Sequence, residues 1–134
     1  MVWYFCDYSP MKVLMIDDND LDLLISRKLI SKQDESLEFT EFSSATEAIV
    51  FLREQGKVAF DLLLLDLNMP EMNGWEFLDE YQKFTFPKAS VYILTSSLDT
   101  RDKLKSKEYE VVKGYFDKPL KQHYISEIIE RHGH

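Results

Sequence analysis

Residues 60–66 read FDLLLLD, a nearly continuous apolar run that ends in the acidic residue Asp66. An apolar run of this length is typical of a β-strand that is covered on both faces of a parallel sheet. A second run, MKVLMI at 11–16, stops in the same way at Asp17 and Asp18. We therefore predict two strands of one parallel sheet, each followed directly by carboxylates.

Strand-like and helix-like patterns alternate on both sides of these runs. Three further strand-like runs lie at 37–42, 91–94 and 114–116. Apolar spacing and capping residues indicate helices around 21–30, 44–56, 75–81, 100–108 and 125–129. The first of these helices has its apolar stripe at Leu21, Leu24, Ile25 and Leu29, broadened by Leu23 and Ile30. This alternation predicts an α/β fold, a doubly wound five-stranded parallel sheet with helices on both faces.

The overall charge is acidic, with 24 Asp and Glu against 16 Lys and Arg and a formal net charge of −8. Such a surface repels a phosphate backbone unless basic residues are concentrated in one place. The basic run at 101–107 is interrupted by Asp102 and is typical of a solvated helix face. We therefore expect no direct binding of nucleic acid. No apolar stretch approaches the length of a membrane span, so we expect no membrane association.

The chain of 134 residues fits one domain, which we expect to span residues 11–131. Residues 1–10 form an aromatic amino-terminal extension without the basic start and long apolar centre of a secretory signal, and their role stays open. The single cysteine, Cys6, excludes an internal disulfide and fits a cytoplasmic location.

Four of the five expected strands end next to chemically active side chains, namely Asp17 and Asp18, Asp66, Thr95 and Lys118. The carboxyl ends of parallel strands share one edge of the sheet, where ligands bind, so we expect these side chains to converge. Each feature alone could be a helix cap, a loop or a turn. Their order at successive strand ends indicates a functional site.

The composition of this site indicates its ligands. Neighbouring carboxylates repel one another unless a cation holds them, and oxygen ligands suit Mg²⁺. No cysteine or histidine lies near these strand ends, which argues against zinc. A lysine beside an acidic, metal-bearing pocket indicates an anion between them, and a phosphoryl group fits best. We therefore predict Mg²⁺ as the cofactor and a phosphoryl group as the bound anion.

The chain resembles the receiver domain of bacterial two-component response regulators over residues 11–131. The matching stretches are IDDN (16–19), LLLLDLNMPEMNG (62–74), ILTSS (93–97) and YFDKPL (115–120). The resemblance implies a flavodoxin-like sheet with the strand order 2-1-3-4-5 and a cis peptide bond between Lys118 and Pro119. It also implies a signalling switch of a phosphorelay that takes part in its own phosphoryl transfer and dephosphorylation, not a dedicated enzyme.

The resemblance further implies a role for each matching residue. Asp66 would be the phosphoacceptor, and Mg²⁺ would be held by Asp17, Asp18, Asp66 and the backbone carbonyl of Asn68. Thr95 would bind the phosphoryl group, Lys118 would pair with it, and Tyr115 would be the switch aromatic whose rotamer reports phosphorylation. The phosphodonor would be a sensor histidine kinase or a histidine phosphotransfer protein. The signal would pass to an unknown downstream protein from a monomer or weak homodimer.

Three other functions share parts of this pattern. A haloacid dehalogenase-type phosphatase needs a second acid two residues after its aspartate, where this chain has the amide Asn68. A flavodoxin-type electron carrier needs a Ser/Thr/Gly-rich phosphate loop, where this chain has the acidic stretch 17–20. A scaffolding pseudo-receiver is expected to lack one of the acids or the lysine, all of which are present. The pattern therefore favours a phosphoacceptor.

Overall fold

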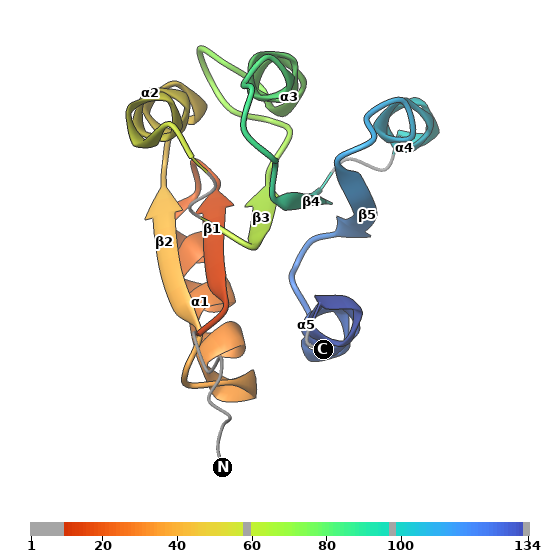
Figure 1. The fold of residues 1–134 in the computed structure, drawn as a ribbon. Helices are drawn as coiled ribbons and strands as arrows, with labels where there is room; N and C mark the ends of the chain where they lie inside the picture. The colour runs from red at the N-terminus through yellow and green to blue at the C-terminus, as the bar shows by residue number, and fades with distance from the viewer. Residues whose placement is uncertain (1–9, 58–59, 97–98, 133–134) are drawn as a thin grey trace.

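The computed structural model describes residues 10–57, 60–96 and 99–132, so residues 1–9, with Cys6, and Ser97 lie outside the described residues. Within these ranges the elements are β1 (Lys12–Ile16), α1 (Asp20–Gln33), β2 (Glu38–Phe42), α2 (Ala45–Gln55), β3 (Leu62–Leu65), α3 (Gly74–Gln82), β4 (Ser90–Thr95), α4 (Thr100–Ser106), β5 (Val112–Asp117) and α5 (Gln122–His132). All strand pairings are parallel, and the sheet order is β2-β1-β3-β4-β5 (Figure 1). The predicted α/β class and strand order are both confirmed.

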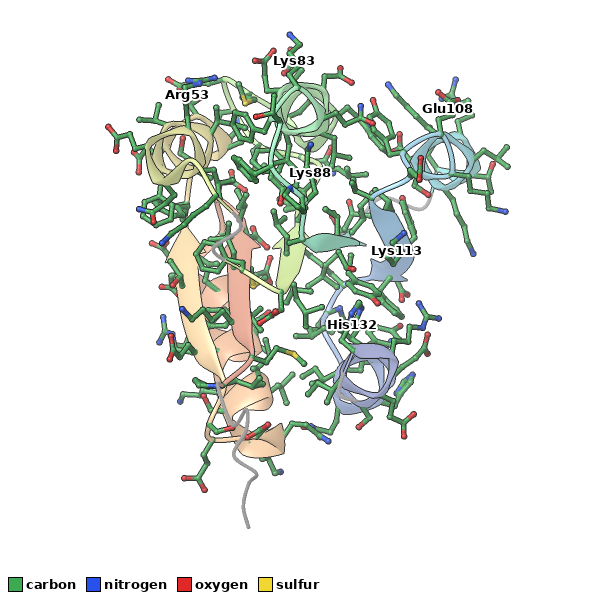
Figure 2. All side chains as sticks on the ribbon, viewed as in Figure 1. Arg53, Lys83, Lys88, Glu108, Lys113 and His132 are labelled. Carbon is green, nitrogen blue, oxygen red and sulfur yellow. The ribbon has the colours of Figure 1, made fainter. Side chains whose placement is uncertain are left out.

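The sheet is the middle of three layers, because successive residues of a strand point to opposite faces. The face covered by α1 and α5 includes Val13, Met15, Leu62 and Leu64. The face covered by α2 and α3 includes Leu14, Ile16, Leu63 and Leu65. In Figure 1, α2, α3 and α4 lie at the top of the view and α1 and α5 lie below them; Figure 2 shows side chains filling the space between. Burial on both faces explains the nearly continuous apolar sequences of β1 and β3.

The buried face of α1 differs from the predicted apolar stripe. Leu23 and Ile30 are buried, whereas the exposed fractions of Leu21, Leu24 and Ile25 are 62%, 38% and 36%. Apolar residues lie on more than one side of this helix, so spacing alone does not select the side that meets the sheet. Packing of Leu23 and Ile30 into the core shared with α5 fixes the rotation of α1 about its axis.

The fifth strand is longer than predicted, covering Val112–Asp117 instead of 114–116. Its backbone pairs with β4 over most of this length, and this pairing sets the strand's length independently of side-chain polarity. Gly114 lies against the ring of Tyr92 on β4, where a Cβ would come within 2.8 Å of Cδ1. A larger residue at 114 would therefore separate the two strands.

Capping residues hold both ends of α2 and the start of α4. Ser44 accepts a hydrogen bond from the Glu47 N–H at 3.3 Å, and α2 ends at Gly56, whose φ is +66°. Asp99 caps α4 by accepting a hydrogen bond from the Arg101 N–H at 2.9 Å. None of the helices in the described ranges combines the length and apolar character needed to cross a bilayer.

Candidate functional site

The carboxyl ends of β1 and β3 place two acidic residues side by side. Ile16 pairs with Leu65 in the sheet, so Asp17 and Asp66 leave adjacent strands at the same edge. The Asp66 N–H donates a hydrogen bond to the Ile16 carbonyl at 3.0 Å, and the Asp17 N–H donates to the Phe42 carbonyl at 3.1 Å. The strand register therefore fixes the backbone positions of both acids.

Asp17 and Asp66 are almost fully buried, with exposed fractions of 0% and 4%. Asp18 is exposed, yet one carboxylate oxygen from each of the three residues lies within 4.8 Å of the others. Asp17 Oδ1 also accepts a hydrogen bond from the Asn19 N–H at 2.9 Å, which orients its carboxylate. The structure thus brings together the three acids that the sequence placed at these strand ends.

The ammonium group of Lys118 lies among three carboxylates, which follow β1, belong to the first turn of α1 and follow β3. Its Nζ is 2.8 Å from Asp17 Oδ2, 2.8 Å from Asp22 Oδ2 and 3.5 Å from Asp66 Oδ1. The Lys118 side chain is only 13% exposed. The Lys118–Pro119 peptide bond is cis, as the resemblance implied. One cation is therefore shared by three anions in a partly desolvated place.

Burial and charge change the titration of these groups. Burial, and then the neighbouring charge of Asp17, raise the pKa of Asp66 to about 6, although Lys118 opposes the rise. Burial likewise raises the pKa of Asp17 against the opposing hydrogen bond from Lys118. Burial alone would lower the pKa of Lys118, but its hydrogen bonds to Asp17 and Asp22 prevail and raise it. Lys118 therefore stays cationic, whereas burial makes Asp17 and Asp66 harder to ionise than exposed carboxyl groups.

Thr95 connects the end of β4 to this pocket. Its side chain is fully buried, and its backbone carbonyl accepts a hydrogen bond from the Lys118 N–H at 2.8 Å. The Asn68 Nδ2 group donates a long hydrogen bond of 3.5 Å to Thr95 Oγ1. The loop after β3 and the loop after β5 thus both contact Thr95 at the end of β4.

The loop between β3 and α3 is held against the end of β3. Asn73 caps α3 in a reciprocal capping box with Glu76, both hydrogen bonds being 2.9 Å. The Gly74 N–H donates to the Leu67 carbonyl at 2.9 Å, and a Cβ on Gly74 would lie 2.7 Å from the Asp66 carbonyl oxygen. Only a glycine fits this close approach of the helix start to the strand end.

The predicted switch residue, Tyr115, lies on β5 next to β4. Its hydroxyl oxygen is buried and has no hydrogen-bond partner among the described residues. Burial, and then the charges of Asp102 and Asp99, raise the pKa of this phenol. A buried hydroxyl without a partner costs free energy, so a rotation that gives it a partner or water would be favourable.

An open depression of about 470 Å³ leads to the site and is lined by Asp18, Asn19, Asp22, Asp66, Asn68, Ser96, Lys118 and Pro119. Asp22 is the charged residue of this group that the sequence did not predict as part of the site. Its position in the first turn of a helix that starts beside Asp17 and Asp18 was the available signal. Without knowledge of how α1 is rotated, that signal does not say which side of the helix the carboxylate occupies.

The donor atoms of the acidic cluster fit a hard divalent cation. Asp17, Asp18 and Asp66 offer only carboxylate oxygens, and the exposed position of Asp18 leaves access for water. Mg²⁺ prefers oxygen ligands and usually keeps several waters. The acidic cluster therefore agrees with the kind of metal that the sequence predicted.

A model of the family described as the response regulator receiver domain matches residues 13–130. The chain belongs to this family. Receiver domains of two-component systems are phosphoryl-accepting switches, and the flavodoxin-like sheet of this chain is the architecture of that family. The receiver fold that the sequence predicted is thereby confirmed, as is the prediction of a phosphoryl-accepting switch, which is the function of this family.

Similar proteins include hybrid signal transduction histidine kinase L of Dictyostelium discoideum, 27% identical over 91% of this chain. Transcriptional regulatory protein FlgR of Helicobacter pylori is 30% identical over 90% of this chain. The chain spans only 7% and 29% of the lengths of these two relatives. Among solved structures, a two-component response regulator from Cytophaga hutchinsonii superposes with a TM-score of 0.81 at 29% identity, covering 92% of this chain and 96% of that one.

Proposed function

We propose that Asp66 is the phosphoacceptor through which this receiver domain works as a switch in a phosphorelay. The observation that carries the proposal is the environment of Asp66, a nearly buried carboxylate beside two further acids and a lysine that they share. Thr95 and Asn68, which also line this edge of the sheet, complete the group. A phosphoryl group on Asp66 would thus find a cation and a hydroxyl donor close by.

Phosphoryl transfer in this proposal is a displacement at phosphorus. A carboxylate oxygen of Asp66 forms the new bond, and the phosphorus–nitrogen bond of a phosphohistidine breaks. The electron pair of the broken bond leaves with the imidazole, which takes up a proton. A pKa of about 6 leaves most of Asp66 ionised at neutral pH, so the nucleophile is available.

Asp17, Asp18 and Asp66, with the backbone carbonyl of Asn68, are the groups that would hold Mg²⁺. The bound cation supplies charge neutralisation for the acids and for the phosphoryl oxygens. Lys118 pairs with one phosphoryl oxygen, and the Thr95 hydroxyl donates a hydrogen bond to another. The contribution of these side chains is therefore orientation and electrostatic stabilisation.

We propose that Thr95 and Tyr115 transmit the change. A hydrogen bond from Thr95 to the phosphoryl group would draw the end of β4 towards Asp66 and open space next to β5. The buried hydroxyl of Tyr115, which has no partner among the described residues, can then rotate with little loss of hydrogen bonding. The face formed by α4, β5 and α5 would change shape, and a partner that prefers one shape would shift the population.

The partners follow from the chemistry of this switch. We propose a sensor histidine kinase or a histidine phosphotransfer protein as the phosphodonor and an unidentified protein as the receiver of the signal, with the domain monomeric or weakly dimeric. Relatives named histidine kinases support the first of these. The domain takes part in its own phosphorylation and dephosphorylation without being a dedicated enzyme.

The test is phosphorylation by acetyl phosphate in the presence of Mg²⁺, followed by intact mass. We expect one base-labile phosphoryl adduct on the parent protein, none on Asp66→Asn and full labelling of Asp61→Asn, which changes a carboxylate at the other end of the same strand. Labelling of Asp66→Asn equal to that of the parent would show that another residue accepts the group. Turnover of small phosphate esters without an adduct would favour a phosphatase instead.

A further inference from the structure

The tightest contacts of Lys118 are not with the proposed phosphoacceptor. Charge-assisted hydrogen bonds between ammonium and carboxylate groups are typically about 2.7–2.9 Å long. The distances from Lys118 Nζ to Asp17 and Asp22 are both 2.8 Å and lie in this range, whereas the distance to Asp66 is 3.5 Å. The ammonium group therefore lies closer to Asp17 and Asp22 than to Asp66. Of the two close contacts, the one with Asp22 Oδ2 has the geometry of a hydrogen bond, whereas Asp17 Oδ2 has no hydrogen-bond partner among the described residues.

The position of Asp22 is fixed by the start of α1. The Asp22 N–H donates a hydrogen bond of 3.0 Å to the capping side chain of Asn19, which holds the first helical turn. From this turn Asp22 Oδ2 accepts a hydrogen bond of 2.8 Å from Lys118, a residue 96 positions later in the chain. The Asp22 side chain is 26% exposed, so the ion pair is only partly screened by solvent.

We propose that Asp22 is a positioning residue that restrains Lys118 and thereby sets the affinity of the site for a phosphoryl group. This inference rests on the proposed role of Asp66. A phosphoryl group carries about −1.5 to −2 charges at neutral pH and competes with Asp22 for the same ammonium group. Asp22 holds the lysine at hydrogen-bond distance. Binding of a phosphoryl group therefore has to weaken the contact between Lys118 and Asp22, and this cost lowers the affinity of the site for the phosphoryl group.

The test measures binding of beryllofluoride, a phosphoryl mimic, by calorimetry at saturating Mg²⁺. Asp22→Asn is expected to bind it more tightly by roughly threefold to fivefold, the size expected for the loss of a partly exposed ion pair. The matched control is Asp20→Asn, which removes the same charge from the same helical turn, where the structure shows no contact with Lys118. The affinity of the control for beryllofluoride is expected to stay within about twofold of the parent, because solvent and salt screen the interaction of an exposed charge with the site.

A second background shows whether Asp22 acts through Lys118. In Lys118→Met the further change Asp22→Asn is expected to have no effect on beryllofluoride binding, because the restrained group is gone. Persistence of the gain in that background, or an equal gain in Asp20→Asn, would show a general charge effect and overturn the inference.

The Nζ resonance of Lys118 in ¹⁵N-lysine-labelled protein provides a direct measurement. We expect it to shift in Asp22→Asn in the direction that beryllofluoride shifts it in the parent, and to stay unchanged in Asp20→Asn. An unchanged Lys118 resonance in Asp22→Asn would also overturn the inference that Asp22 restrains Lys118. If the parent neither binds beryllofluoride nor forms the adduct, the proposed function fails together with this inference. If the parent responds and Asp22→Asn matches it, only the inference fails.

Discussion

The two ends of β3 carry the same kind of side chain in opposite surroundings. At the amino end, Asp61 is exposed, and its carboxylate accepts a hydrogen bond from the Lys12 N–H at 2.8 Å. At the carboxyl end, Asp66 is 4% exposed and lies beside Asp17 and Lys118. A backbone N–H of the neighbouring strand β1 satisfies the carboxylate of Asp61, whereas charged side chains from other parts of the chain surround Asp66.

The lysines near the two edges differ in the same way. Near the amino edge, Lys88 donates to the carbonyl of Phe84 and Lys113 donates to the carbonyl of Glu110, each only a few residues away (Figure 2). Lys118 instead contacts three carboxylates that are distant from it in sequence. Lys88 and Lys113 therefore only hydrogen-bond to nearby backbone carbonyls. Around Lys118, in contrast, charged side chains from distant parts of the sequence converge, shift one another's pKa values and form a place where an anion and a cation can bind.

The largest effect is expected where the carboxyl end of β3 meets α3. Gly74→Val should lower the free energy of unfolding by about 2–4 kcal/mol, because its side chain would meet the Asp66 carbonyl and Leu67. Gly56→Ala, at a left-handed position with no neighbouring atom within 4 Å, should cost only about 1 kcal/mol. Urea unfolding measures both; equal losses would show that the strand end has more room than its contacts indicate.

The next effect concerns the charge on Asp66 in metal-free protein. Because folding raises its pKa from 3.8 to about 6, this acid supports the fold at low pH, and the support is lost as the pH rises through about 6. Asp66→Asn should therefore be more stable than the parent at pH 7 by about 1–3 kcal/mol, and the difference should shrink towards pH 4.

Asp61→Asn is the control for this measurement and should change the stability by less than about 0.5 kcal/mol at either pH, because the carboxylate is exposed. Chemical unfolding with EDTA at the two pH values gives the comparison. If the stability difference between Asp66→Asn and the parent did not depend on pH, burial and the charge of Asp17 would not raise the pKa of Asp66.

Removal of Asp18, the exposed acid of the cluster, should weaken the binding of Mg²⁺ and leave the stability of the fold nearly unchanged. Asp18→Ala is expected to lower the Mg²⁺ affinity roughly tenfold, because an anionic ligand is lost while two buried carboxylates remain. Asp20→Ala removes a neighbouring charge outside the cluster and should change the affinity by no more than about twofold. Titration calorimetry distinguishes the two, and an unchanged affinity in Asp18→Ala would remove this residue from the metal site.

The smallest effect compares the two ends of β4. Thr95→Ala should still form the adduct on Asp66 but weaken its effect on partner binding or self-association a few-fold, corresponding to about 1 kcal/mol of coupling. Ser90→Ala, at the amino end of the same strand, should leave that effect intact. Adduct by mass and association by sedimentation are measured on the same samples. If the adduct changed association as strongly in Thr95→Ala as in the parent, Thr95 would have no part in transmitting the signal. Asp66 would still be the acceptor.

The sequence by itself determined the class of fold and the edge of the sheet that carries chemistry. Continuous apolar runs ending in acids predicted buried parallel strands, and parallel strands bring their carboxyl ends to one edge, so Asp17, Asp18 and Asp66 converged as expected. The strand order came from the family resemblance, because hydrophobic patterns do not encode which strands are neighbours.

Only the tertiary structure decided how α1 is rotated and what Lys118 contacts. Apolar residues on several sides of α1 left its buried face open, and packing against the sheet and α5 selected Leu23 and Ile30. The same rotation brings Asp22 to Lys118, across 96 positions of sequence. A contact of this kind depends on the relative placement of two elements, and no local pattern in either element contains that information.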